Sequence, residues 1–175
     1  MRLLCYLLFL IFTPTYCLAE NIINIEKCEL HENHSIKLIS LRTIDGDTPY
    51  LVFDNIITNA FLDGSTYSGE ILLSKCVNHA LIFALNYGSP YVKGCLITNA
   101  TTRDNIEGFC FAEKNTPASI WFEQQNTLLV FNNDNNLGDW QGKYIIYDSR
   151  KNNADAYDEL PKKSGYKIYH LNPTK

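Results

Sequence analysis

A cysteine and a histidine lie three residues apart at Cys76 and His79, within the apolar segment 70–87. A cysteine thiolate is a nucleophile and a metal ligand, and a neighbouring histidine can act as its general base. On a helix, residues three apart share a face, so these two side chains could meet. The pair supplies only two of the four ligands of a structural zinc site, which favours a plain histidine at a helix surface.

The segment that must position this pair has a helical pattern. Apolar residues recur at spacings of three and four through residues 70–87, and Gly88 and Pro90 follow. This period predicts an α-helix that ends near residue 87. The second half is apolar on all sides, so we expect the helix to be buried. Amide dipoles at its start would stabilise a Cys76 thiolate.

Residues 74–136 resemble the transglutaminase-like branch of the papain-type cysteine hydrolases. In that family a cysteine opens a helix, a Gly-x-Pro turn follows, and later strands bring in a histidine and an acidic or amide residue. The resemblance implies Cys76 as the nucleophile and residues 88–90 as the turn. It also implies Asn132 or Asp134 as the acidic or amide partner.

The chain departs from the family at the base. The family expects a histidine at the start of the run 108–111, but none lies between His79 and His170. A thiol without a positioned base loses most of its catalytic advantage. A hydrolase would therefore need His79, or the distant His170, to act with Cys76 and Asn132. The missing base favours a disulfide as the role of Cys76.

The N-terminus has the pattern of an export signal. Arg2 precedes an apolar run at residues 3–12, and small residues follow before Glu20. This pattern predicts a secretory signal peptide over residues 1–19. The apolar run would span about 15 Å as a helix, about half of a bilayer core, so we expect no membrane anchor after processing. The remainder, residues 20–175, is expected to be a single secreted α+β domain.

Four of the six cysteines remain after cleavage, and in an oxidising compartment they predict two disulfides with three possible connectivities. Cys95 and Cys110 lie in apolar runs on either side of the polar segment 99–107. If those runs pair as a hairpin, the two cysteines come within disulfide reach. That pairing leaves Cys28 for Cys76. We expect a periplasmic or secreted location.

The rest of the chain is rich in short β-prone runs separated by Asn, Asp, Gly and Pro clusters. The runs lie at residues 35–41, 50–53, 91–98, 108–113, 119–123, 127–131, 143–147 and 165–171. The predicted fold is therefore α+β, with one buried helix packed on a mainly antiparallel sheet and two disulfides. We interpret the polar segment 149–164 as a surface loop with a short helix.

Charge and composition argue against several classes of partner. The chain has 15 Lys and Arg against 19 Asp and Glu, a formal net charge of −4 at pH 7. Nucleic acid and anionic membranes attract clustered basic residues, and only basic pairs occur here, so we expect neither partner. His31 and His34 are interpreted as part of a solvated loop, and segment 132–139 lacks the order of a calcium loop. We expect no cofactor and no metal.

Elimination leaves a binding function. We expect an exported non-catalytic binding protein, for example an immunity or inhibitor protein, with a protein partner. Asn33 and Asn99 lie in glycosylation triplets, which matter only in a eukaryotic secretory pathway. Outward-facing aromatic residues of the second half would form an adhesive surface for a protein or glycan. These aromatic residues are Trp121, Trp140, Tyr144, Tyr147, Tyr157, Tyr166 and Tyr169.

Overall fold

The computed structural model describes residues 21–171, with gaps at residues 32–33, 89–90, 103–104, 125, 134–139 and 152. The predicted signal peptide lies outside the described residues. Thirteen described strands form three antiparallel sheets. The predicted α+β fold is wrong, because the described residues contain no α-helix.

Each sheet is built from consecutive strands of the chain. The first sheet contains β1 (Asn21–Glu29), β2 (Ser35–Thr43), β3 (Gly46–Phe53) and β4 (Ile56–Asn59), in that order. The middle sheet contains β5 (Glu70–Val77), β6 (Ala80–Asn86), β7 (Val92–Thr102) and β8 (Asn105–Glu113), also in chain order. The third sheet has the order β12 (Asn153–Tyr157), β11 (Tyr144–Asp148), β10 (Asn126–Asn132), β9 (Ser119–Glu123) and β13 (Lys167–His170).

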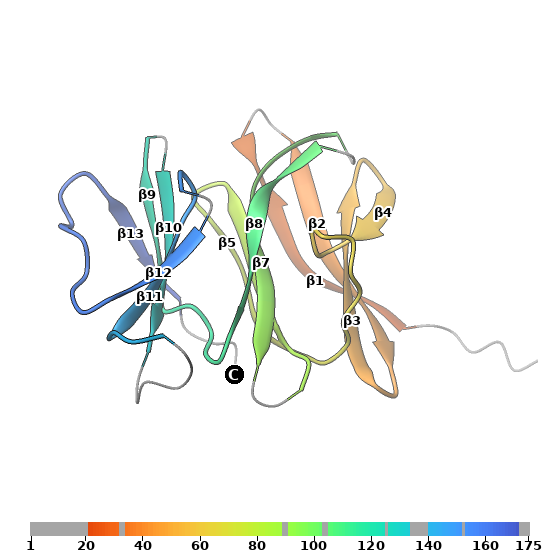
Figure 1. Ribbon diagram of the computed structural model, residues 1–175. Coiled ribbons are helices and arrows are strands. Elements are labelled where there is room, and N and C mark those ends of the chain that lie inside the picture. Colours follow the sequence, from red (N-terminus) through yellow and green to blue (C-terminus); the bar gives the residue numbers. More distant parts are fainter. Residues whose placement is uncertain are drawn as a thin grey trace, which may run out of the picture.

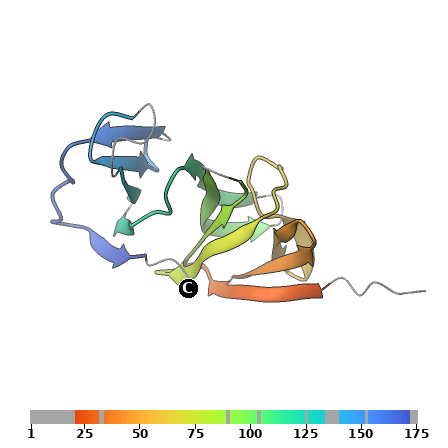
Figure 2. The same ribbon diagram turned by 90° about the horizontal axis from the view of Figure 1, so that it is seen from below.

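The three sheets stack as layers, with the middle sheet between the other two (Figure 1). The view from below in Figure 2 shows the same sequence of layers. One apolar core fills the space between the first and middle sheets, and Phe53 and Phe83 both belong to it. A second core lies between the middle and third sheets and contains Ile82, Leu96 and Phe131. The middle sheet is therefore covered on both faces.

Strand β6 explains why the segment 70–87 reads as a helix. Its first six residues, 80–85, are all buried. Their side chains alternate, so that Phe83 enters the first core and Ile82 the second. A strand covered on both faces shows no alternation of polar and apolar residues, and its apolar run cannot be told from a buried helix by period. The predicted buried helix is in fact the β5–β6 hairpin.

The turn of this hairpin consists of Asn78 and His79, with φ angles of 47° and 61°. Positive φ at both central positions is the requirement of a type I′ turn, whose twist matches that of paired strands. Asparagine tolerates this conformation better than most residues because its side chain can hydrogen-bond locally. The same arrangement recurs at Asp54 and Asn55, with φ angles of 48° and 63°, between β3 and β4.

The disulfides have the pairing that the sequence predicts. Cys95 on β7 is bonded to Cys110 on β8, directly opposite in the register of the predicted hairpin. Cys28 on β1 is bonded to Cys76 on β5, and this bond ties the edge of the first sheet to the middle sheet. Both disulfides are compatible with an extracellular or periplasmic location. A membrane-spanning helix of sufficient length and hydropathy is not found in the described part of the chain.

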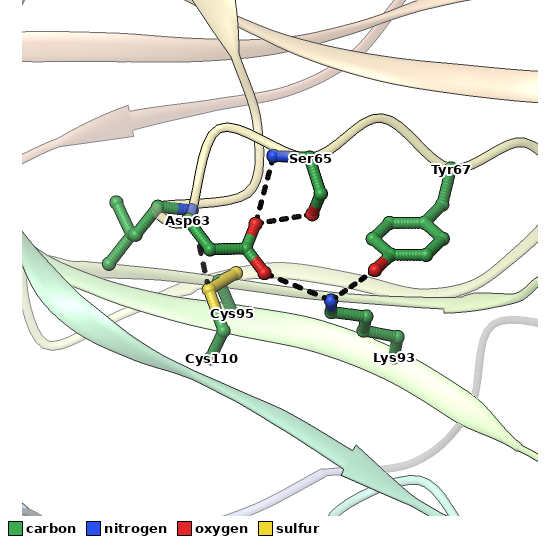
Figure 3. Close-up of a disulfide and its surroundings, with 7 residues drawn as sticks. Asp63, Ser65, Tyr67, Lys93, Cys95 and Cys110 are labelled. Carbon is green, nitrogen blue, oxygen red and sulfur yellow. Dashed lines mark hydrogen bonds and ion pairs between the residues drawn. A yellow bond between two sulfur atoms is a disulfide. The ribbon is translucent and has the colours of Figure 1, made fainter.

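The connection between β4 and β5, residues 60–69, closes the side of the first core and is held down by Lys93 (Figure 3). The Lys93 ammonium donates to Asp63 Oδ2 at 3.1 Å and to the Tyr67 hydroxyl at 2.7 Å. Asp63 also accepts hydrogen bonds from the backbone N–H and hydroxyl of Ser65, and these bonds, with Lys93, lower the pKa of Asp63 to about 2. This connection therefore packs firmly over the Cys95–Cys110 hairpin.

Most of the aromatic residues expected on an adhesive surface belong to the cores. Trp121 is only 2% exposed and packs with Tyr144, Tyr157 and Tyr166 in a third apolar cluster of the third sheet. The others are partly buried. The segment 149–164, predicted as a surface loop with a short helix, instead contains strand β12, and Leu160 within it and Tyr166 just after it pack on this cluster.

Candidate ligand-binding cleft

A cleft of about 730 Å³ lies at one end of the junction between the middle and third sheets. The β5–β6 turn, β8, the end of β9 and the β9–β10 turn contribute to its walls. Its volume falls in the range of small-molecule sites in proteins, which is about 300–1,000 Å³. Its lining is mixed, with amide, hydroxyl and charged groups beside two phenylalanine rings.

Two histidines from distant parts of the chain meet at this cleft. The rings of His31 and His79 have centroids 4.9 Å apart, with 38° between their planes. His79 Nδ1 lies 3.0 Å from the main-chain oxygen of Glu29. A carbonyl oxygen only accepts, so Nδ1 donates this hydrogen bond and fixes the orientation of the ring. His34, by contrast, packs on Phe53 at a centroid distance of 5.7 Å and lies apart from this pair.

Asn126 forms a buried polar part of the cleft wall at 3% exposure. Its Nδ2 donates to the Tyr166 hydroxyl at 3.3 Å, and its Oδ1 accepts from the Ser149 hydroxyl at 3.1 Å. The Ser149 hydroxyl in turn accepts from the N–H of Thr127 at 2.8 Å. Buried polar groups held by several hydrogen bonds are rigid, so this wall has a preset arrangement of donors and acceptors.

Two aromatic rings line the cleft from different sheets. Phe109 lies on β8 of the middle sheet and Phe122 on β9 of the third sheet. Tyr147 stacks parallel to Phe109, with centroids 6.0 Å apart and 4° between the planes. Tyr169 contacts Phe122 edge to face at 5.8 Å. Each ring is therefore held in place by a second ring behind or beside it.

Charges of both signs line the cleft. Glu107 and Glu123 supply carboxylates, and Lys167 supplies an ammonium. Lys167 Nζ lies 3.3 Å from Asn78 Oδ1, a contact between β13 and the β5–β6 turn. Arg150 lies 3.8 Å from Glu123, in an exposed pair. The cleft is thus neither a basic nor a strongly acidic surface.

The residues proposed for hydrolysis are not assembled into one site. Cys76 Sγ is bonded to Cys28, so no thiolate is present at that position. His79 lies in a turn and is oriented by Glu29. Asn132 lies at the far end of β10 from Asn126, six residues away, which is about 20 Å along a strand. Asp134, the other residue considered for this position, falls outside the described residues.

The described residues contain no group of three or more His, Cys, Asp and Glu side chains arranged to hold a metal ion. The Asn-rich segment beyond residue 133 lies largely outside the described part of the chain. Comparison with protein families, with curated proteins and with solved structures finds no match to this chain.

A second buried polar contact lies deeper in the junction of the middle and third sheets. The Tyr147 hydroxyl donates to Glu113 Oε1 at 2.7 Å, and Glu113 is 6% exposed. Burial raises the pKa of the Glu113 carboxyl, and the hydrogen bond from Tyr147 offsets part of this rise. Burial and the contact with Glu113 also raise the pKa of Tyr147. This contact fixes the ring that supports Phe109.

Sequence reasoning missed most of this cleft. Phe109, Phe122 and Asn126 are separated along the chain and share no motif, so only the stacking of the sheets brings them together. The predicted helical pairing of His79 with Cys76 is wrong, because Cys76 lies on β5 and His79 lies in the turn that follows it. The one local signal available was the pair Asn78-His79, which suits a two-residue hairpin turn.

Proposed function

We propose that this chain is an exported non-catalytic binding protein with a protein partner, of the kind represented by immunity and inhibitor proteins. The observation that carries the proposal is the Cys28–Cys76 disulfide, which occupies the residue that a cysteine hydrolase would need as its nucleophile. An oxidised sulfur has no thiolate to attack a substrate.

Three further observations support a binding role. The Cys28–Cys76 disulfide joins the first sheet to the middle sheet and the Cys95–Cys110 disulfide cross-links the β7–β8 hairpin, so these two layers form a rigid scaffold, which lowers the entropic cost of binding. A preset polar cleft lies at one end of that scaffold. The chain is acidic, with a sequence pI of about 5.5, so its electrostatics suit a basic protein partner better than a nucleic acid.

A thiol assay tests the absence of cysteine chemistry. The non-reduced native protein is treated with iodoacetamide near pH 7, and modified residues are located by mass spectrometry. We expect no modification at Cys76, and we expect modification of all four described cysteines in a control sample reduced and denatured beforehand. Rapid stoichiometric alkylation of Cys76 in the native protein would refute the proposal and return the hydrolase to consideration.

Inhibition assays test the partner. Purified exported hydrolases and toxins of the source organism are assayed with and without a stoichiometric amount of the oxidised chain. We expect at least one to lose activity, and the reduced and alkylated chain serves as the control because it should lose its scaffold. If every enzyme and toxin keeps full activity, the immunity or inhibitor role is wrong.

A further inference from the structure

The cleft has the chemistry of a site for a neutral, hydroxyl-rich ligand, and we infer that it binds an oligosaccharide, either free or attached to a protein. This inference goes beyond the proposed protein-binding function, because it names a ligand chemistry that a free polysaccharide also supplies. It depends on three properties of the cleft: its charge, its hydrogen-bonding groups and its two aromatic rings.

The charges exclude strongly charged ligands. Two carboxylates, from Glu107 and Glu123, line the cleft with the Lys167 ammonium, and Arg150 pairs with Glu123 at 3.8 Å, so these four charges balance. A polyanion would meet both carboxylates, and a polycation would meet both the Lys167 ammonium and the Arg150 guanidinium, so like charges would oppose either ligand. A neutral ligand with many hydroxyl groups can accept from the ammonium and donate to both carboxylates. The charged groups then keep their contacts with Asn78 and Arg150 and gain hydrogen bonds to the ligand, without a net charge being buried.

The hydrogen-bonding side chains of the cleft are amides and hydroxyls, and other side chains hold them in position before a ligand binds. Asn126 is held by Tyr166 and Ser149 at 3% exposure, and Asn78 is held by Lys167. Amides both donate and accept, which matches a sugar hydroxyl that does the same. Because these side chains are ordered before binding, less conformational entropy is lost when a ligand arrives.

Two aromatic rings give the cleft surfaces on which a sugar ring can stack. Phe109 and Phe122 approach the cleft from opposite sheets, and each is braced by a tyrosine. The face of an aromatic ring carries negative charge density and attracts the weakly positive C–H groups of a sugar ring. An apolar ligand would use the rings but leave the polar walls unpaired, which costs free energy. A saccharide uses both.

The test uses the oxidised, full exported chain and four neutral probes: maltohexaose, cellohexaose, chitohexaose and mannohexaose. Binding is measured by saturation-transfer NMR and by titration calorimetry. We expect saturable binding of at least one probe, and no comparable binding of a hyaluronan hexasaccharide, which carries carboxylates. If none of the four neutral probes binds, or if hyaluronan binds best, the inference is wrong.

Two matched variants locate the site. Phe109→Leu and Phe122→Leu remove a ring and keep an apolar side chain, so the fold should persist, and each should weaken binding about tenfold if a ring contributes about 1.4 kcal/mol. Tyr91→Ala removes an aromatic side chain that is 46% exposed and lies outside the cleft, and it should leave affinity unchanged. Equal affinity in all three variants would place any sugar binding elsewhere and overturn the assignment.

A final comparison distinguishes a free polysaccharide from a glycan on a protein. It also distinguishes saccharide binding from the proposed protein binding. A high-mannose glycoprotein is tested before and after enzymatic removal of its glycans. Binding that disappears on deglycosylation supports a protein-borne glycan, and binding of the free hexasaccharides alone supports a free polysaccharide. Glycoprotein binding that survives deglycosylation overturns the saccharide inference but leaves a protein-binding function standing, whereas a reactive Cys76 thiol removes that function independently.

Discussion

Shortening the side chains of β6 should be costly on both faces of the middle sheet. Ile82 faces the third sheet and Phe83 the first, and both are 0% exposed. Ile82→Ala removes three carbon atoms worth about 0.8 kcal/mol each, a loss of about 2.4 kcal/mol before any cavity forms. The cavity raises the expected cost into the range of about 2–5 kcal/mol, and Phe83→Ala should cost about 3–5 kcal/mol.

Ile57 provides a control of the same residue type. It lies on the edge strand β4 and is 56% exposed. Ile57→Ala should lower the free energy of unfolding by only about 1 kcal/mol, because more than half of the side chain is already in water. All three variants are compared with the wild type by urea unfolding of the oxidised protein, with tryptophan fluorescence and circular dichroism as probes. The m-values should agree, so that midpoint differences report stability.

The comparison distinguishes two arrangements of the sheets. If Phe83→Ala is costly and Ile82→Ala costs no more than Ile57→Ala, the third sheet does not cover the middle sheet. In that case burial on both faces would not explain the continuous apolar sequence of β6, and the cleft described between the middle and third sheets would not exist. Equal and large costs at both positions support the three-layer packing.

Three further changes test other contacts. Burial raises the pKa of Glu113 in the folded state, so its ionisation should lower the free energy of unfolding of the wild type as pH rises above about 4.5. Glu113→Gln should remove this fall. A free energy of unfolding that increases with pH over that interval would contradict the reasoning. Replacing Cys28 and Cys76 together by serine opens a loop of 48 residues and should lower the free energy of unfolding by about 4 kcal/mol, measured by urea unfolding against the wild type. A loss below about 1 kcal/mol would argue against the disulfide. Gly94→Ala would bring a Cβ into steric overlap with the carbonyl oxygen of Phe83, so we expect a loss of about 1–3 kcal/mol in the same assay. Unchanged stability would mean that β6 and β7 are less closely packed.

The sequence predicts the local β-structure well where one face of a strand is polar or a turn is marked. The runs 119–123 and 127–131 coincide with β9 and most of β10, and the hairpin that aligns Cys95 with Cys110 is present. The run 153–157 was missed as β12 because its residues are polar or small and its partner β11 supplies the apolar side chains. Period alone could not identify β6, since burial on both faces removes the alternation that marks a strand.

The candidate site was less predictable than the fold. The predicted helix opening at Cys76 is wrong, because that residue lies one position before the end of β5 and is bonded to Cys28 of β1. Histidine and cysteine attract attention because their chemistry is distinctive. Phenylalanine and asparagine at a cleft carry no such signal, so Phe109 and Asn126 become visible only after the sheets are stacked.

The order of the three layers in space is also their order along the chain. Strands β1 to β4 complete the first sheet before β5 begins, and the third sheet is made entirely from residues after β8. During synthesis, which proceeds from the N-terminus, the chain can therefore pack its first core and form the Cys28–Cys76 disulfide before the strands of the third sheet are made. During that interval Ile82, Leu96 and Phe111 face water. A product truncated near residue 113 should therefore aggregate, because it lacks the strands that cover the second apolar face of the middle sheet.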